Sequence, residues 1–285
     1  MLTMEYIKSI AKERAAKVAI GVGWEKEDFI SNTVLSAIDA QKQGLAKVIL
    51  VGDESKIHKY LIKDEVEVVH SDRPWFEIVK LIKENYVDAA VRGYLSATKV
   101  INEVKKSFDI THLHRIALLS TYKGELFFFA PVGIDEGNDL MDKYIFVEHA
   151  LNLHRKLDIN PKIAILSGGR KEDFGRDPRV DKTLGEGEFL SSIIKERGLA
   201  SDVKHYGILI EDAINEQATF ILAPDGICGN LIFRTLEFLG GGKGIGAIYA
   251  DLIPEKIFID VSRTMVDYVD SISLASFISK VLKKD

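Results

Sequence analysis

The stretch from Lys17 to Asp53, KVAIGVGWEKEDFISNTVLSAIDAQKQGLAKVILVGD, contains two short apolar runs separated by one amphipathic segment. The runs KVAIGV and KVILVGD are rich in β-branched residues, which is typical of buried strands. The segment between them has apolar residues at helical spacing and ends at Gly44, a residue type that often follows a helix. A strand, a helix and a second strand in this order indicate a parallel β-α-β unit.

The same alternation continues to the end of the chain. Further strands are expected over residues 66–69, 88–93, 161–167, 219–223, 246–250 and 256–261. Helices are expected near residues 54–61, 74–85, 96–106, 144–157, 188–197, 208–215 and 231–239, with a closing helix through residue 284. The rhythm changes over His114–Val132, where two strand-like runs flank Lys123–Gly124 and predict a hairpin. The sequence therefore predicts an α/β fold with mainly parallel strands and a domain break near residue 115.

Composition excludes several classes of function. The chain has 285 residues, 46% of them hydrophobic, and a formal net charge of −5, so no basic excess indicates nucleic-acid binding. Its one cysteine cannot form an internal disulfide, which fits a reducing cytoplasm. Charged residues interrupt the first apolar positions, so neither a signal peptide nor a membrane span is expected. We expect a cytoplasmic protein.

Two glycine-rich segments fail the tests for nucleotide-binding loops. GVG after the first strand lacks a third glycine, because Lys26 stands where a dinucleotide fingerprint requires one. GGGKGIG has Gly244 after Lys243, where a P-loop requires Ser or Thr, and it follows a helix rather than a strand. This second segment is expected to cap the helix and turn into the next strand.

The segment APDGICGN is a stronger candidate for a ligand-binding turn. It connects the strand over 219–223 to a helix expected to begin near Asn230, and ligands bind at such turns in parallel sheets. Free amides around Gly229 would suit an anionic or carbonyl ligand, whereas the simpler alternative is that Asn230 only caps its helix. No local histidine activates Cys228, which is expected to be a buried thiol rather than a nucleophile.

Two other turns combine arginine with hydroxyl side chains, an arrangement that suits phosphate or carboxylate. One is VRGYLSAT, with Arg92 and Gly93 before Ser96 and Thr98. The other is IDVSR, in which Ser262 and Arg263 precede a helix expected to carry Asp267 and Asp270. For each turn, the alternative is an ordinary helix cap beside a solvated arginine.

The histidines do not predict a metal site. His112 and His114 share one strand-like face, but no cysteine or carboxylate pattern completes a ligand set, and His149 and His154 diverge on their helix. The loop Gly168–Lys182 has interleaved basic and acidic residues, and its length favours a functional loop over a merely solvated one.

Taken together, these segments resemble the phosphate acetyl/butyryltransferase family, which shares its fold with isocitrate and isopropylmalate dehydrogenases. The resemblance is carried by FILAPDGICGNLIFRTLEFLGGGKGIGAI, FIDVSR, GYLSAT and RVDK. Within that group, SGGRKEDFGRD, APDGICGN and VRGYLSAT together resemble the MtxX-type proteins of methanogenic archaea (methanogenesis marker protein 4), which are associated with corrinoid-linked methyl transfer.

The resemblance implies two three-layer α/β/α domains with a cleft between them, and a homodimer. The domains would be residues 1–115 plus 252–285, and residues 116–251. It also implies a small phosphate-containing ligand, with coenzyme A as a substrate and no tightly bound cofactor. For catalysis we predict Ser262 and Arg263, which match the family's Ser-Arg pair, and Asp270, which lies next to the place of the family's aspartate. The residues that the resemblance assigns to substrate binding are Arg92, Gly93, Ser96, Thr98, Asp225, Gly229 and Asn230.

The chain departs from that family at two positions. Thr264 replaces the glycine after Ser-Arg, and Val269 stands at the place of the catalytic aspartate. Asp267 and Asp270 flank this place, but a shift along a helix turns a side chain in another direction. Two functions therefore stay open: a transferase for an acyl phosphate or coenzyme A, and a non-catalytic subunit that accompanies a methyltransferase or a corrinoid protein in methanogenesis.

Overall fold

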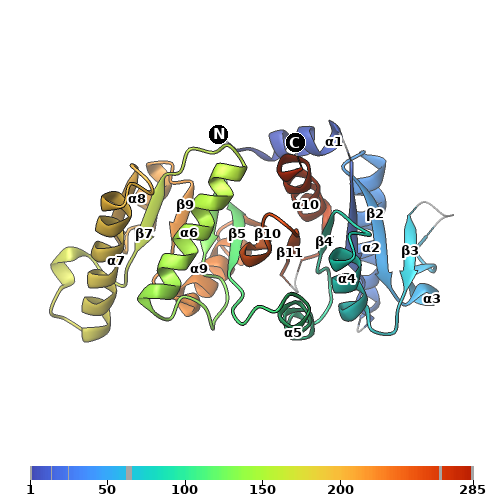
Figure 1. The fold of residues 1–285 in the computed structure, drawn as a ribbon, viewed down its shortest axis with the longest axis horizontal. Helices are drawn as coiled ribbons and strands as arrows, with labels where there is room; N and C mark the ends of the chain where they lie inside the picture. The colour runs from blue at the N-terminus through green and yellow to red at the C-terminus, as the bar shows by residue number, and fades with distance from the viewer. Residues whose placement is uncertain (1, 14, 25, 62–65, 263–264, 284–285) are drawn as a thin grey trace. The chain divides into compact units, whose positions relative to one another are not determined.

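The computed structural model describes residues 2–13, 15–24, 26–61, 66–262 and 265–283, which form two compact α/β units. The terminal unit contains Leu2–Leu113 and Ile245–Asp285, and the central unit contains His114–Gly244. Figure 1 draws the terminal unit in blue, teal and red, and the central unit in green to orange. The α/β class predicted from the sequence is confirmed.

The sheet of the terminal unit has the strand order β3-β2-β1-β4-β11-β10. Its strands are β1 (Ala16–Gly21), β2 (Ala46–Gly52), β3 (Glu67–His70), β4 (Ala89–Val91), β10 (Lys243–Tyr249) and β11 (Phe258–Asp260). Neighbouring strands are parallel from β3 to β11, and β10 is antiparallel to β11. The strand order reverses between β1 and β4, which is the point where open parallel sheets bind ligands.

Helices cover both faces of this sheet. They are α1 (Met4–Glu13), α2 (Glu27–Lys42), α3 (Glu54–Ile57), α4 (Pro74–Lys83), α5 (Ala97–Phe108), η2 (Ala250–Leu252) and α10 (Val269–Leu282). α4 and α5 pack on one face, where Ala19, Ile49 and Phe258 of the strands meet Ile78 and Val100. α2 and α10 contact the same strands from the other face, because successive strand residues point to opposite sides.

The central unit has the strand order β5-β6-β9-β7-β8. Its strands are β5 (Arg115–Ser120), β6 (Leu126–Ala130), β7 (Ile163–Leu166), β8 (Val203–Gly207) and β9 (Phe220–Leu222). Its helices are α6 (Leu140–Lys156), η1 (Lys171–Asp173), α7 (Pro178–Glu196), α8 (Ile210–Asn215) and α9 (Gly226–Phe238). β5 and β6 form the predicted antiparallel hairpin, and the other neighbours are parallel.

The sequence prediction was wrong over residues 168–207. The long loop is shorter than expected, because α7 begins at Pro178, whose fixed φ suits the first turn of a helix, and the Asp177 carboxylate accepts a hydrogen bond from Arg179 N at 2.8 Å. The strand β8 was missed. It is an edge strand with Lys204 exposed, so its short polar-interrupted sequence carries little apolar signal.

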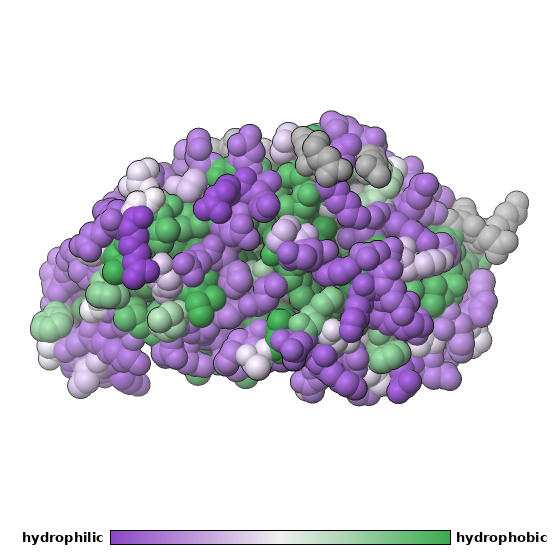
Figure 2. Space-filling model, in the orientation of Figure 1, coloured by the Kyte–Doolittle hydropathy of each residue, from purple (hydrophilic) through white to green (hydrophobic). Residues whose placement is uncertain are grey.

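Within the described residues, no helix is long and apolar enough to cross a membrane. The most apolar helix, α10, is short, and its residues from Val269 to Ser279 are buried apart from Asp270. Figure 2 shows hydrophilic side chains over much of the visible surface, with hydrophobic side chains between them.

Candidate functional site

Two turns with predicted site residues lie side by side at the carboxyl end of the terminal unit's sheet. β4 and β11 are parallel neighbours, with Ala90 paired to Phe258 and Val91 paired to Ile259. The chain leaves β4 at Arg92 toward α5 and leaves β11 at Val261 toward α10. Both turns therefore open at the same edge of the sheet.

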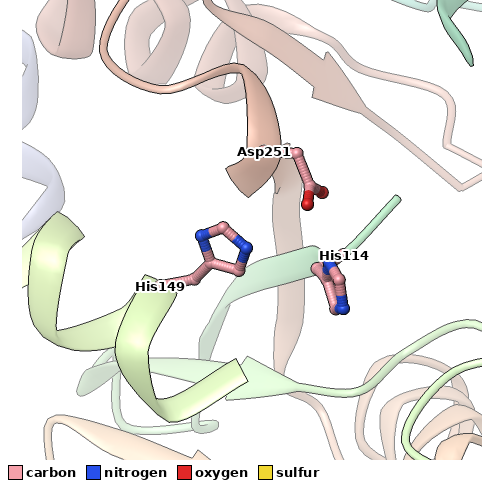
Figure 3. Close-up of side chains that lie close together, drawn as sticks. All are labelled: His114, His149 and Asp251. Carbon is pink, nitrogen blue, oxygen red and sulfur yellow. The ribbon is translucent and has the colours of Figure 1, made fainter. Parts of the chain in front are cut away.

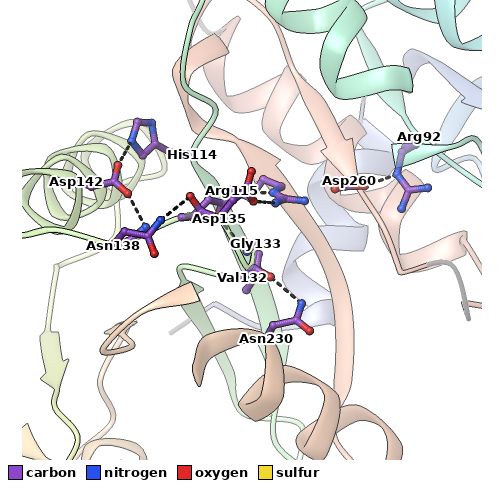
Figure 4. Close-up of polar contacts among 12 residues, drawn as sticks. Arg92, His114, Arg115, Val132, Gly133, Asp135, Asn138, Asp142, Asn230 and Asp260 are labelled. Carbon is purple, nitrogen blue, oxygen red and sulfur yellow. Dashed lines mark hydrogen bonds and ion pairs between the residues drawn. The ribbon is translucent and has the colours of Figure 1, made fainter. Parts of the chain in front are cut away.

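Arg92 ties these two turns together, as Figure 4 shows for its contact with Asp260. Its Nε donates to the Asp260 carboxylate, and its terminal nitrogens donate to the carbonyls of Gly93, Leu95 and Val261. Arg92 is 2% exposed and Asp260 is 6% exposed. The alternative of a solvated arginine is wrong, because the guanidinium is buried and bonded on every nitrogen.

The turn after β1 packs against the turn after β4 and explains the GVG segment. Gly93 has a positive φ of 59°, and a side chain there would place its Cβ 2.0 Å from the Gly21 carbonyl oxygen. A Cβ on Gly23 would lie 2.6 Å from the Tyr94 carbonyl oxygen. Glycine at these positions permits close backbone contact, so the motif that fails as a nucleotide loop has a packing function.

The hydroxyl residues predicted to bind the ligand lie in the segments that follow β4 and β11. Ser96 occupies the N-cap position of α5 and is half-buried, and its side chain makes no capping hydrogen bond. Thr98 is exposed in the first turn of α5, and Ser262 is half-buried just after β11. Arg263 lies outside the described residues, so its predicted contact with a phosphate stays a prediction.

The two acidic residues near the end of the chain are both engaged within the terminal unit. Asp270 forms a 2.7 Å ion pair with Lys8 Nζ, at about one-third exposure of both side chains. The helix α10 begins at Val269, so Asp267 precedes it rather than belonging to it, and its carboxylate accepts a hydrogen bond from Val269 N at 2.9 Å. A catalytic role for Asp270 stays a prediction.

In the central unit, the APDGICGN segment is built differently from the prediction. The helix α9 begins at Gly226, four residues before the expected start, and Asp225 is its N-cap, accepting a hydrogen bond from Cys228 N at 2.8 Å. Asn230 is therefore not the cap. Its side-chain amide donates to the Val132 carbonyl at 2.9 Å, as drawn in Figure 4.

The expectation of free amides near Gly229 is also wrong. Gly229 N donates to the Asp225 carbonyl at 2.9 Å, and Gly226 N donates to the Glu136 carbonyl at 2.9 Å. A Cβ on Gly229 would lie 1.9 Å from the Pro131 carbonyl oxygen. The glycines of this segment therefore let α9 pack directly on the chain after β6.

Burial raises the pKa of the Cys228 thiol, and the neighbouring Asp225 carboxylate adds to the shift. A raised pKa disfavours the thiolate, which is the nucleophilic form. The interpretation of Cys228 as a packing residue is consistent with this environment.

Sequence reasoning missed two polar clusters in the central unit, since their members are far apart along the chain. In the first, Arg115 Nε contacts Glu136 Oε1 at 2.5 Å, and Gly133 N donates to the same carboxylate. Figure 4 shows Arg115 beside the turn that holds Asp135 and Asn138. Burial raises the pKa of Glu136.

The second cluster links a serine, a histidine and a glutamate, the order of side chains found in catalytic triads. His205 Nε2 lies 3.0 Å from Ser167 Oγ, and His205 Nδ1 lies 3.2 Å from Glu188 Oε2. Ser167 is only 1% exposed and bonds the Gly169 carbonyl, so its hydroxyl has no access to a substrate in this structure. The cluster fixes β8 to the end of β7 and to α7.

The histidines pair in a way that their spacing did not indicate. His114, just before β5, faces His149 of α6 with ring centroids 5.1 Å apart (Figure 3). His154 points elsewhere, with Nδ1 2.7 Å from the Ala150 carbonyl oxygen and Nε2 2.9 Å from Thr219 Oγ1. Asp251, drawn in the same view, belongs to the terminal unit.

Comparison with known proteins identifies the family. A Methanosarcina mazei protein named "Putative methyltransferase mtx subunit X" is 42% identical over 281 residues, covering 99% of this chain and 96% of the relative. The chain belongs to the MtxX family. No family model matches the chain.

More distant similarities connect this MtxX protein to phosphotransacylases. The phosphate butyryltransferase of Clostridium acetobutylicum is 22% identical over 301 residues, covering 96% of this chain and 97% of the relative. A solved branched-chain phosphotransacylase from Enterococcus faecalis has a TM-score of 0.68 at 16% identity, covering 93% of this chain and 99% of that one. A 4-hydroxythreonine-4-phosphate dehydrogenase from Klebsiella pneumoniae has a TM-score of 0.62 at 12% identity, covering 93% and 100%. The fold resemblance stated from the sequence is confirmed.

Proposed function

We propose that this MtxX protein binds a small phosphate-containing ligand, an acyl phosphate or coenzyme A, and acts as a transferase on it. The observation that carries the proposal is the pair of turns after β4 and β11, held together by Arg92 at the carboxyl edge of the sheet. The distant similarity to phosphate butyryltransferase supports the ligand class.

In this proposal, one residue of the two turns positions the backbone and the others bind the ligand. Arg92 is a positioning residue, because each nitrogen of its guanidinium already donates to Asp260 or to a backbone carbonyl. The hydroxyls of Ser96, Thr98 and Ser262 are the groups that would donate to phosphate oxygens, and Arg263 would supply the positive charge.

A transferase with these groups would catalyse attack of a thiol on the carbonyl carbon of an acyl phosphate. The new bond is the carbon–sulfur bond of a thioester, and the bond that breaks joins the carbonyl carbon to the phosphate oxygen. Inorganic phosphate leaves with its electron pair, and a base accepts the thiol proton. Asp270 is the carboxylate assigned to this proton transfer.

The alternative function, a non-catalytic subunit of a corrinoid-linked methyltransferase complex, is favoured by one observation. Asp270 pairs with Lys8 at 2.7 Å, and Val269 at the place of the family's aspartate is buried. To accept the thiol proton, the Asp270 carboxylate would have to leave its ion pair with Lys8. The name of the Methanosarcina mazei relative contains the word subunit, which is consistent with this alternative.

Calorimetric titration of the protein with coenzyme A and with acetyl phosphate tests the binding proposal. We expect saturable binding that Ser262→Ala/Arg263→Ala weakens at least tenfold, since each hydrogen bond to a charged group contributes about 1.5–3 kcal/mol. Ser201→Ala, an exposed serine of the central unit, is the matched control and should bind like the wild type. No heat with either ligand, or equal affinity in the double variant, contradicts the proposal.

Turnover separates the two functions once binding is measured. Acetyl-coenzyme A formation that Asp270→Asn abolishes supports the transferase. Binding without turnover supports the accessory subunit. Sedimentation of the same sample tests the homodimer that we propose from the resemblance.

A further inference from the structure

The two tryptophans of the chain, Trp24 and Trp75, lie together in the terminal unit although they are far apart in the sequence. Their ring centroids are 6.2 Å apart, and the ring planes are tilted by 56°. Trp75 is partly buried against the apolar core under α4, whereas Trp24 is 38% exposed. Trp24 therefore presents indole surface to solvent beside a ring that is anchored in the core.

Lysine side chains lie next to both rings. Lys99 Nζ is 4.0 Å from the centre of the Trp75 ring, and Lys56 Nζ is 5.9 Å from the centre of the Trp24 ring. The electron-rich face of an indole attracts an ammonium group, so these contacts keep positive charge beside the rings. Lys99 is exposed. We call Trp24, Lys56, Trp75 and Lys99 the tryptophan–lysine platform.

Four different segments supply the platform, and each one follows a different parallel strand. Trp24 follows β1, Lys56 lies in α3 after β2, Trp75 lies in the first turn of α4 after β3, and Lys99 lies in the first turn of α5 after β4. These strands are neighbours in the order β3-β2-β1-β4, so their carboxyl ends meet at one edge of the sheet. The platform therefore lies at the reversal of strand order between β1 and β4, where open α/β sheets bind ligands.

The chain on the near side of Trp24 is held by a second aromatic pair. Tyr94 stacks on Phe29 with ring centroids 3.8 Å apart and planes 8° apart. A Cβ on Gly23 would lie 3.1 Å from Tyr94 Cδ1, so the residue before Trp24 packs directly on this pair. A position fixed in advance reduces the entropy that a ligand loses on binding.

We propose that the tryptophan–lysine platform binds a nucleotide, with the base against the indole of Trp24 and the phosphate paired with the ammonium of Lys99. Stacking on an aromatic side chain accepts any base, because every base has a flat π-face. Lysine binds phosphate as a point charge. The lysines thus supply what the GVG segment lacks as a phosphate-binding loop. The inference does not rest on the proposed transferase reaction, because acetyl phosphate has no ring to stack.

Intrinsic fluorescence tests the proposal directly, because both tryptophans of the chain belong to the platform. We expect saturable quenching by AMP, GMP and UMP, weaker quenching by adenosine, and unchanged fluorescence with inorganic phosphate at the same concentrations. In calorimetric titrations, Trp24→Ala should weaken AMP binding by about 5–150-fold. Lys99→Ala should weaken it by about tenfold.

Two matched control variants should bind AMP like the wild type. Tyr122→Ala removes a 72% exposed aromatic side chain of the central unit, and Lys47→Ala removes an exposed lysine from β2. Trp24 is exposed, so Trp24→Ala keeps the test valid if a variant of the anchored Trp75 does not fold.

Three results would overturn the assignment. They are the absence of binding of all three nucleotides at millimolar concentration, wild-type affinity for AMP in Trp24→Ala, and equal quenching by inorganic phosphate and AMP. Ser262→Ala/Arg263→Ala should keep its affinity for AMP, and a loss there would place the nucleotide at the phosphate site instead. AMP binding without any heat from acetyl phosphate or coenzyme A would contradict only the proposed function.

Discussion

Replacement of Arg92 by methionine should be among the most destabilising single changes in the terminal unit. Methionine has a similar length but no charge, so Asp260 would stay buried at 6% exposure without its cation. Removing one partner of a buried ion pair costs about 3–5 kcal/mol, because the remaining charge loses its counterion in a site that water does not reach. The equilibrium constant for unfolding should therefore rise by roughly two to three and a half orders of magnitude.

Urea denaturation followed by circular dichroism measures this cost as a lower midpoint. The double variant Arg92→Met/Asp260→Leu should be more stable than Arg92→Met alone, because removing both charges leaves no unpaired ion. Arg179→Met, which removes an arginine from the exposed pair with Asp177, is the matched control and should leave the midpoint unchanged. A loss below about 1 kcal/mol in Arg92→Met, or a double variant less stable than the single one, would refute the reasoning.

Three further predictions test other parts of the fold. Gly229→Ala places a Cβ 1.9 Å from the Pro131 carbonyl oxygen and should destabilise by more than about 1 kcal/mol, whereas Gly185→Ala, within α7 and with open space around its Cβ, should stabilise by about 0.5–1 kcal/mol. Equal urea midpoints for these two variants would contradict the packing argument. Asp225→Ala removes the cap of α9 and should cost about 1 kcal/mol of unfolding free energy in the same assay. Burial lowers the pKa of His154, so the unfolded chain binds its proton more readily and stability should fall as the pH drops below about 6.5. This loss should be smaller in His154→Gln, and an unchanged pH slope of the midpoint would contradict it.

The elements of the fold were predictable where periodicity is strong. The stretch Lys17–Asp53 indicated β1, α2 and β2, and their observed bounds differ from the expected ones by one or two residues. The hairpin was predictable because Lys123–Gly124 separates two apolar runs, and Gly124 adopts a positive φ of 85°. β8 was not predictable, because Lys204 and His205 interrupt its apolar residues, so VKHYG shows neither a continuous apolar run nor a strict alternation.

The candidate site was predictable only as a set of residue types. Turns with arginine and hydroxyl side chains were visible in the sequence, but whether Arg92 faced a ligand or the protein depended on Asp260, 168 residues further along the chain. The same holds for Gly229, whose function depends on the carbonyl of Pro131.

The sequence by itself determined the α/β class, the hairpin and the resemblance to phosphotransacylases, because helix and strand periods and short motifs are local properties of a chain. Only the tertiary structure decided that Arg92 is hydrogen-bonded to Asp260 within the protein. The same holds for the ring of His114, which lies against the ring of His149 and not that of His112. These pairings join residues far apart in sequence, so they follow from strand order and helix packing, which no local spacing encodes.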